Sequence, residues 1–265
     1  MSARARLRRL LSEGQPACGL FLSIAASSII EIAAVAGFDF VLIDLEHTLI
    51  DGHEIEALLA TADRAGVSAL LRVPDARSER ILQVLDAGAA GIVVPRVTSG
   101  AEAREAVLRS RYAPVGQRGL NAGRLGRFGD CDLVDLLARL NEETLVVAMI
   151  EDRQGLQAAD EIAALSGIDA LLLGAADYSA AIGLPWQTTC EEVIEAERVI
   201  ADAARRNGRH VFAIPRREED VTRHLACGAL GIIAANDRGL LREALARKNE
   251  SWRSAANAFL PSKDR

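Results

Sequence analysis

The feature that most constrains the fold is a repeated pairing of apolar, strand-like runs with segments of helical spacing. Eight such runs occur in the 265 residues, at 18–23, 40–46, 68–74, 91–97, 145–151, 169–177, 210–215 and 229–237. Several of the segments between them stop at a glycine, as helices commonly do at their C-terminal caps. Apolar strands alternating with amphipathic helices favour a parallel sheet that is covered on its outer face, and eight such units favour closure into a (β/α)8 TIM barrel of the α/β class.

An open, doubly wound sheet is the alternative architecture, and it is disfavoured because no Gly-x-Gly-x-x-Gly turn follows the first strand-like run. The length fits a single barrel domain over residues 1–265. Within it we expect an N-terminal helix over 1–14 and a C-terminal tail over 249–265. The first eleven residues are rich in arginine, as in organelle transit segments, but they run directly into Leu-Ser-Glu-Gly, which favours a capping helix that ends at Gly14.

Composition excludes several classes of protein. A net charge of −6 and a pI near 5.4 give no overall attraction to nucleic acid, and no apolar run is long enough to span a bilayer. The four cysteines are widely separated, so they predict neither a zinc finger nor a disulfide framework. We therefore expect a cytoplasmic protein with free thiols that acts on a small polar molecule.

One segment interrupts the alternation of strands and helices. Residues 112–130 contain five glycines and little apolar periodicity. Long irregular segments inside compact domains are often lids or binding loops, and the alternative is a solvated connection between helices. We favour the functional interpretation.

Charged residues recur at the ends of the strand-like runs, where a TIM barrel places its active site. Glu151 and Asp177 each follow a run of apolar residues, on consecutive predicted strands. Two carboxylates that converge in a partly dry site repel one another unless a cation neutralises them, and oxygen ligands suit Mg²⁺ or Mn²⁺. The pair therefore predicts a divalent metal site, with two solvated rim residues as the alternative.

Three further side chains at strand ends are candidates for catalysis. Arg72 ends an apolar run and could stabilise an oxyanion, pair with Asp44 or Glu46, or do both. His47 follows Asp44 by three positions, so the carboxylate could orient the imidazole for proton transfer. The small residues of 174–183 could begin a helix whose free N–H groups hold a carboxylate or phosphate, or they could serve close packing.

Taken together, these stretches resemble the HpcH/HpaI aldolase and citrate lyase family, in particular class II pyruvate aldolases of the 4-hydroxy-2-oxoheptanedioate aldolase type. The resemblance runs from about residue 18 to 245, in the same order and spacing. The matching stretches are DFVLIDLEH, LLRVP, ILQVLDAGAAGIVVPRV, RYAPVGQRG, MIED and GIDALLLGAADYSAAIG.

The resemblance implies a TIM barrel of the phosphoenolpyruvate/pyruvate-binding type, assembled as a homo-oligomer, a trimer or a hexamer, with exchange of the last barrel helix. It implies a metal-dependent aldolase that cleaves or forms 4-hydroxy-2-oxo acids through a pyruvate enolate, with a 2-oxo acid and an aldehyde as its small-molecule partners. The roles carried over are metal binding by Glu151 and Asp177, enolate stabilisation by Arg72, proton transfer by His47 with Asp44, and binding of the pyruvate carboxylate by Gly174, Ala175 and Ala176.

The sequence departs from the family pattern at the predicted pocket. Met149 stands where a glutamine often lines the 2-oxo acid site, and Arg96 follows Pro95 where a methionine is frequent. Loss of a polar contact changes which ligand is tolerated. Three alternatives therefore stay open: a citrate-lyase-like enzyme, an oxaloacetate-decarboxylating carbon–carbon lyase, and a 2-oxo acid-binding protein without turnover.

Overall fold

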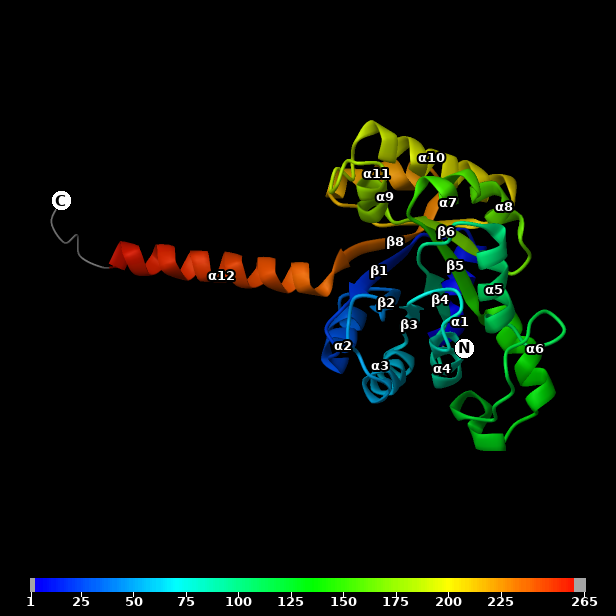
Figure 1. The fold of residues 1–265 in the computed structure, drawn as a ribbon. Coiled ribbons are helices and arrows are strands. Elements are labelled where there is room, and N and C mark those ends of the chain that lie inside the picture. Colours follow the sequence, from blue (N-terminus) through cyan, green and yellow to red (C-terminus); the bar gives the residue numbers. More distant parts are fainter. Residues whose placement is uncertain (1–2, 260–265) are drawn as a thin grey trace.

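A closed barrel of eight parallel strands forms the centre of the computed structural model, which describes residues 3–259 (Figure 1). The strands are hydrogen-bonded in the order β1 to β8, with β8 paired to β1. They are β1 (Ala17–Leu22), β2 (Phe40–Asp44), β3 (Ser68–Arg72), β4 (Gly91–Val94), β5 (Leu145–Ile150), β6 (Ala170–Leu173), β7 (His210–Ala213) and β8 (Ala229–Asn236). The predicted (β/α)8 barrel is confirmed, and the open-sheet alternative is excluded because β8 closes onto β1.

Helices surround the barrel and connect its strands (Figure 1). They are α1 (Ala3–Ser12), α2 (Ser27–Val35), α3 (Gly52–Ala65), α4 (Arg80–Ala87), α5 (Gly100–Ser110), α6 (Leu133–Glu143), α7 (Arg153–Gln157), α8 (Ala159–Ala164), α9 (Ala175–Ala181), α10 (Glu191–Arg206), α11 (Glu218–Ala226) and α12 (Asp237–Phe259), with a 3-10 helix η1 (Arg124–Gly129). Among the residues described, no helix is both long and apolar enough to cross a membrane.

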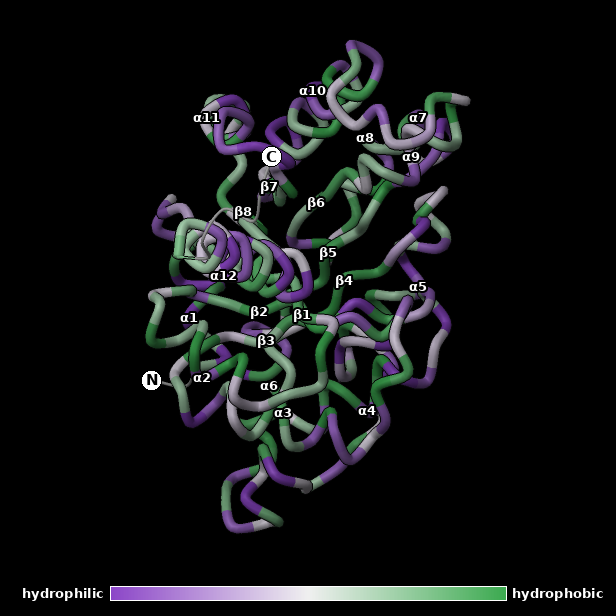
Figure 2. Tube along the Cα trace, turned by 90° about the vertical axis from the view of Figure 1, so that its left-hand side faces the viewer, coloured by the Kyte–Doolittle hydropathy of each residue, from purple (hydrophilic) through white to green (hydrophobic). Residues whose placement is uncertain are grey.

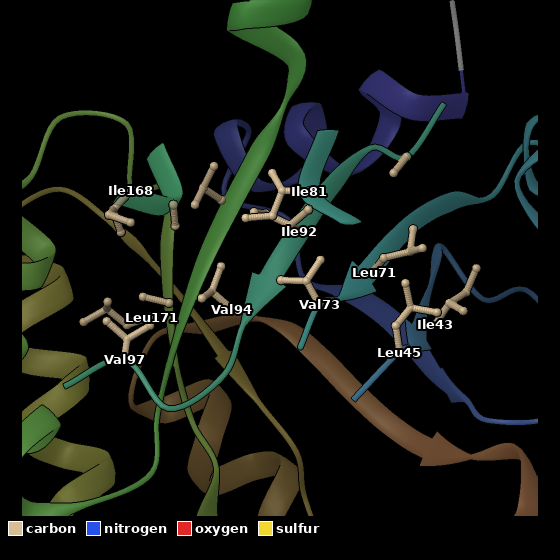
Figure 3. Close-up of a cluster of buried hydrophobic side chains, with 14 of the residues drawn as sticks. Ile43, Leu45, Leu71, Val73, Ile81, Ile92, Val94, Val97, Ile168 and Leu171 are labelled. Atoms are coloured by element: carbon tan, nitrogen blue, oxygen red, sulfur yellow. The ribbon is translucent and has the colours of Figure 1, made fainter. Parts of the chain in front are cut away.

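The alternation of side chains along each strand divides the core into two layers. Phe40, Leu42 and Leu70 point into the barrel, where they pack with Met149 and Phe212. The intervening residues point outward against the helices (Figure 3) and include Ile43, Leu71, Ile92 and Val94. The strands are accordingly mostly hydrophobic, while the outer helices mix hydrophobic and hydrophilic residues (Figure 2).

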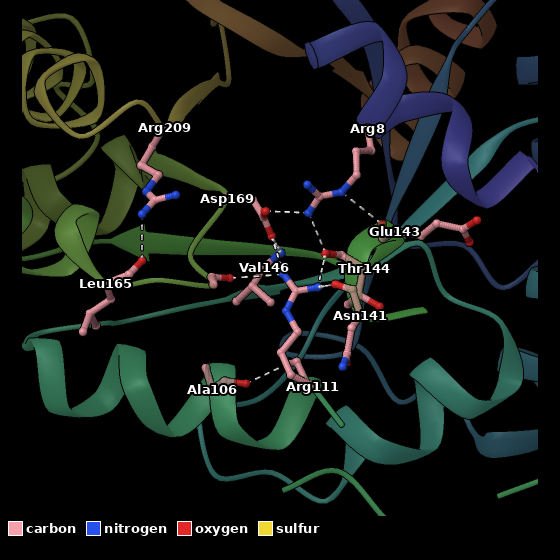
Figure 4. A network of polar contacts seen from close by, with 12 residues as sticks. Arg8, Ala106, Arg111, Asn141, Glu143, Thr144, Val146, Leu165, Asp169 and Arg209 are labelled. Atoms are coloured by element: carbon pink, nitrogen blue, oxygen red, sulfur yellow. Dashed lines mark hydrogen bonds and ion pairs between the residues drawn. The ribbon is translucent and has the colours of Figure 1, made fainter. Parts of the chain in front are cut away.

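The N-terminal helix α1 closes the end of the barrel opposite the carboxyl ends of the strands. Leu7 and Leu11 are buried in the inner layer of the core. Arg8 donates to the carbonyl of Thr144 and pairs with Asp169, which also pairs with Arg111 at 2.8 Å (Figure 4). α1 occupies residues 3–12 of the helix expected over 1–14, whose first two residues lie outside the described residues, and Gly14 follows it in the left-handed conformation.

The irregular segment 112–130 lies at this same closed end. Its Arg118 pairs with Asp86 of α4 at 2.6 Å, and Gln117 N–H donates to the carbonyl of Leu108. The segment joins the end of α5 to α6, and such helix-to-strand connections run along the face opposite the active site in a TIM barrel. The segment therefore lies away from the mouth of the barrel and does not cover the strand ends there, while a function elsewhere on the protein stays a prediction.

The last helix, α12, projects away from the barrel (Figure 1). Only Asp237 at its start is buried, and the apolar side chains of Leu245 and Trp252 are 61% and 65% exposed. The expected tail from residue 249 is not what the structure shows, because the helix continues to Phe259. Residues 260–265 of that expected tail lie outside the described residues.

Candidate active site

The carboxyl ends of the strands surround a cavity of about 1010 Å³. Its wall contains every predicted site residue except Glu151, namely Asp44, His47, Arg72, Met149, Gly174, Ala175, Ala176 and Asp177. Glu151 lies directly behind this wall, because a Cβ added to Gly174 would meet its Oε1 at 2.3 Å. The barrel thus brings together at one mouth residues that are separated by up to 133 positions in the sequence, from Asp44 to Asp177.

Arg72 is fixed between two carboxylates. Asp44 lies opposite it in the register of β2 and β3, and Arg72 Nε donates to Asp44 Oδ1 at 2.8 Å. Arg72 Nη1 lies 3.2 Å from Glu46 Oε2, and the guanidinium stacks over the Phe21 ring at 4.9 Å. All of these contacts are buried or nearly so, which restricts the guanidinium to one orientation at the cavity wall.

Glu151 is a buried carboxylate with one oxygen left without a partner. Its Oε2 accepts a hydrogen bond from the N–H of Arg96 at 2.8 Å, while its Oε1 is buried and receives none from the described residues. The pKa of Glu151 is raised to about 8, mainly by burial and to a smaller extent by the nearby charges of Asp177 and Glu46, whereas the Arg96 hydrogen bond and the charge of Arg72 lower it. An unsatisfied buried oxygen beside a second carboxylate is the arrangement that a cation relieves.

The turn after β6 shapes the floor of the cavity. Gly174 N–H donates to the carbonyl of Ile150 at 2.9 Å, so this N–H is already used within the protein. Ala175 and Ala176 begin α9, and the first N–H groups of a helix have no intrahelical acceptor. Of the three predicted backbone groups, those of Ala175 and Ala176 therefore remain for a ligand, with Asp177 in the same turn.

His47 lies at the rim, with 64% of its side chain exposed. Its Nε2 is 3.9 Å from Glu46 Oε2, whereas Asp44 is engaged by Arg72 and by the N–H of Glu46. The structure therefore differs from the expected pairing of His47 with Asp44, because Asp44 accepts a hydrogen bond from Arg72 on the adjacent strand instead. Glu46 is the acid beside His47.

Sequence reasoning gave no separate role to two residues that the structure places in this site. Glu46 bridges Arg72, His47 and Arg96, whose Nη2 is 3.4 Å from Glu46 Oε1. Arg96 has φ 51° and directs its N–H at Glu151, a left-handed conformation that is uncommon outside glycine. The sequence feature that could have identified Glu46 is its position between Asp44 and His47 at the end of one predicted strand.

A family model described as HpcH/HpaI aldolase/citrate lyase matches residues 17–244. The chain belongs to this family. A hydroxypyruvate/pyruvate aldolase of Deinococcus radiodurans is 36% identical over 241 residues, which is 89% of this chain and 86% of that protein. A 2-keto-3-deoxy-L-rhamnonate aldolase of Klebsiella pneumoniae is 33% identical, over 93% of this chain and 92% of that protein.

Among solved structures of similar proteins, the citrate synthase SbnG superposes with a TM-score of 0.88 at 34% identity, covering 96% of this chain and 99% of the other. The two aldolase relatives are carbon–carbon lyases by name, and the family is one of aldolases and lyases. The prediction that the chain is an enzyme of the carbon–carbon lyase class is thereby confirmed.

Proposed function

We propose that this member of the HpcH/HpaI family is a divalent-metal-dependent aldolase that cleaves or forms 4-hydroxy-2-oxo acids through a pyruvate enolate. The observation that carries the proposal is Glu151 Oε1, which is buried and receives no hydrogen bond from residues 3–259. The charge of Asp177 raises the pKa of this acid and the charge of Arg72 lowers it, so both groups act on the same site. The names of the two aldolase relatives support a pyruvate-type substrate.

Glu151 and Asp177 would hold the metal. They would be the protein's two carboxylate ligands, and residues 3–259 contain no group of three or more His, Cys, Asp or Glu side chains suited to a metal. Oxygen ligands with open positions suit Mg²⁺ or Mn²⁺. Once bound, such an ion polarises the 2-oxo carbonyl as a Lewis acid.

The protein's own groups would perform the remaining steps. Ala175 and Ala176 N–H groups bind the carboxylate of the 2-oxo acid, while Arg72, held by Asp44 and Glu46, donates to the oxygen on which negative charge develops. His47 accepts the proton of the 4-hydroxyl group, the bond between carbons 3 and 4 breaks, and its electron pair forms the enolate as the aldehyde leaves. Protonation of the enolate at carbon 3 then gives the 2-oxo acid.

We further propose that the protein works as a homo-oligomer, a trimer or a hexamer, in which α12 packs against another copy. The helix presents Leu240, Leu241, Leu245 and Trp252 to solvent, and α2 of the barrel exposes Ile32 and Val35. Such apolar surface is rare on monomers and typical of interfaces. Four cysteines without disulfide partners among the described residues suit a reducing compartment, which supports a cytoplasmic location.

A second candidate is a carbon–carbon lyase acting on oxaloacetate, which the 34% identity to a citrate synthase favours. Met149 lines the cavity where a polar residue often stands, so the preferred 2-oxo acid has to be determined by experiment.

The experiment that tests the proposal is exchange of the pyruvate methyl protons with D₂O, followed by NMR with Mn²⁺ or Mg²⁺ present and after chelation. We expect metal-dependent exchange. A protein that binds the metal and pyruvate without exchange would be the non-catalytic 2-oxo acid-binding protein, and one that consumes only oxaloacetate would be the second candidate.

A further inference from the structure

We propose that Arg216, restrained by Trp186, forms a second anion subsite in the active-site cavity, which selects aldehyde acceptors that carry a carboxylate or phosphate away from the carbonyl. This inference rests on the proposed aldolase function and identifies the residue that sets the acceptor class. Its basis is a cationic side chain that faces the cavity and lacks the acidic partners of its neighbours.

Both residues line the cavity that contains Arg72 and Asp177. Arg216 follows the end of β7 at Ala213, and Trp186 lies in the loop after α9. The guanidinium carbon of Arg216 is 6.0 Å from the centroid of the Trp186 ring, which is the outer range of a cation–π contact. The two elements therefore meet on one wall of the mouth.

The charge of Arg216 is not neutralised by an ion pair within residues 3–259, whereas the other arginines of the cavity are engaged. Arg72 contacts Asp44 and Glu46, and Arg217 contacts Glu219 at 2.8 Å and Asp220 at 3.9 Å. Arg238 donates to the carbonyl of Ser23 at 3.1 Å. A guanidinium that keeps all its donors free is suited to bidentate binding of a carboxylate or phosphate.

The surroundings of Arg216 strengthen this interpretation. Its side chain is exposed to the cavity, yet the adjacent protein lowers the pKa of Arg216 by desolvation, and the charge of Asp177 acts in the opposite direction. The group stays protonated at neutral pH, as arginine does generally. Because Arg216 and Asp177 line the same cavity, an acceptor that extends from the predicted metal site along the cavity wall meets this cation.

Trp186 is held in an unfavourable backbone conformation that keeps its ring at this wall. Its φ is 66°, which a bulky residue adopts only where the surrounding structure imposes it, and its side chain is 76% exposed. Residues in such conformations concentrate at ligand-binding sites. The exposed indole gives the anionic acceptor an apolar surface beside the Arg216 charge.

The test compares matched acceptors in pyruvate-dependent aldol addition: 4-oxobutanoate against butanal for the carboxylate, and glyceraldehyde 3-phosphate against glyceraldehyde for the phosphate. The quantity measured is the ratio of kcat/KM for the anionic and the neutral acceptor. For wild type we expect a ratio well above one in at least one pair, which also identifies the preferred anion. Arg216→Met should lower that ratio by about 10- to 100-fold, the usual value of a charge-assisted hydrogen bond, through KM, and Arg216→Lys should restore part of it.

Arg205→Met is the matched control, because this exposed arginine of α10 pairs only with Asp202 and lies outside the cavity. It should leave the ratio unchanged. The inference is overturned if wild type prefers neutral acceptors in both pairs, or if Arg216→Met lowers anionic and neutral acceptors equally. Failure of the proposed function is a separate result, since it appears as absence of pyruvate proton exchange in wild type.

Discussion

Arg72 and Asp44 lie opposite each other on adjacent parallel strands, and a hydrogen bond of 2.8 Å joins Arg72 Nε to Asp44 Oδ1. This pairing positions the guanidinium at the cavity wall. It also engages Asp44 with Arg72, while His47 lies beside Glu46. In the proposed function, Arg72 is the cation that stabilises the developing enolate oxygen.

Arg72→Met should lower kcat for retro-aldol cleavage by about 100- to 1,000-fold, the usual cost of removing one oxyanion donor. Steady-state kinetics with a 4-hydroxy-2-oxo acid measure this. The control is Arg77→Met, an exposed arginine outside the cavity wall, which should retain wild-type kinetics. A variant at position 72 with an unchanged kcat would show that Arg72 only binds Asp44 and Glu46.

His47→Gln should keep metal affinity but lose aldol cleavage, because the exposed imidazole is proposed to take the 4-hydroxyl proton and not to bind the metal. Calorimetric titration with Mn²⁺ and a cleavage assay on the same preparation give the two readouts. His53→Gln, another exposed histidine, serves as the control and should affect neither. Loss of metal affinity in His47→Gln would place this residue among the ligands instead.

Gly174→Ala should weaken the site through steric contact alone. The backbone of Gly174 has φ −81°, which any residue adopts, but a Cβ there would lie 2.3 Å from Glu151 Oε1 and 2.5 Å from its Cγ. We expect a loss of about 1–3 kcal/mol in the free energy of unfolding and weaker metal binding. The control is Gly119→Ala, where nothing lies within 4 Å of the added Cβ. Equal stability and metal affinity in the two variants would contradict the close approach of Gly174 and Glu151.

Much of the barrel was predictable, because most of the strands are buried on both faces and so read as continuous apolar runs. The charged strand ends likewise pointed to the mouth. The pairing of Arg72 with Asp44 and Glu46 was among the expectations from the sequence, and the structure shows both contacts. The orientation of His47 by Asp44 was suggested by local spacing alone, which carries no information about the register that places Arg72 opposite Asp44. The location of segment 112–130 could not be predicted either, because its composition carries no information about which end of the barrel it occupies.

The exposed position of helix α12 could not be predicted from the pattern of its own residues either. Its apolar residues are sparse, and a helix without a partner in its own chain gives the same pattern as one packed weakly on the barrel. Only the structure shows that Leu245 and Trp252 are exposed.

His224 should make the protein less stable in mild acid. Burial is the main cause that lowers its pKa to about 4, the charge of Arg223 lowers it too, and Asp220 raises it; Glu197 lies 3.9 Å from its Nε2. Protonation of His224 therefore favours the unfolded chain. The stability that the neutral, buried imidazole contributes is fully present above about pH 6.5 and decreases as the pH falls toward 4. The loss should amount to about 2–3 kcal/mol relative to His224→Gln in urea unfolding. Parallel pH profiles for wild type and variant would refute a buried neutral imidazole.

The central claim, that Glu151 and Asp177 hold one divalent ion, is tested most directly by calorimetric titration of wild type and Glu151→Gln with Mn²⁺. The substitution preserves shape and an acceptor for the Arg96 N–H but removes the carboxyl group that would ionise on binding the metal beside Asp177. Glu142→Gln, at an exposed position of α6, is the control. We predict one ion per chain for wild type and the control, with affinity at least about 100-fold weaker in Glu151→Gln, since a ligand matters more than the outer-shell partners whose loss costs 10- to 100-fold. No uptake by wild type, or equal affinity in Glu151→Gln, would contradict the account.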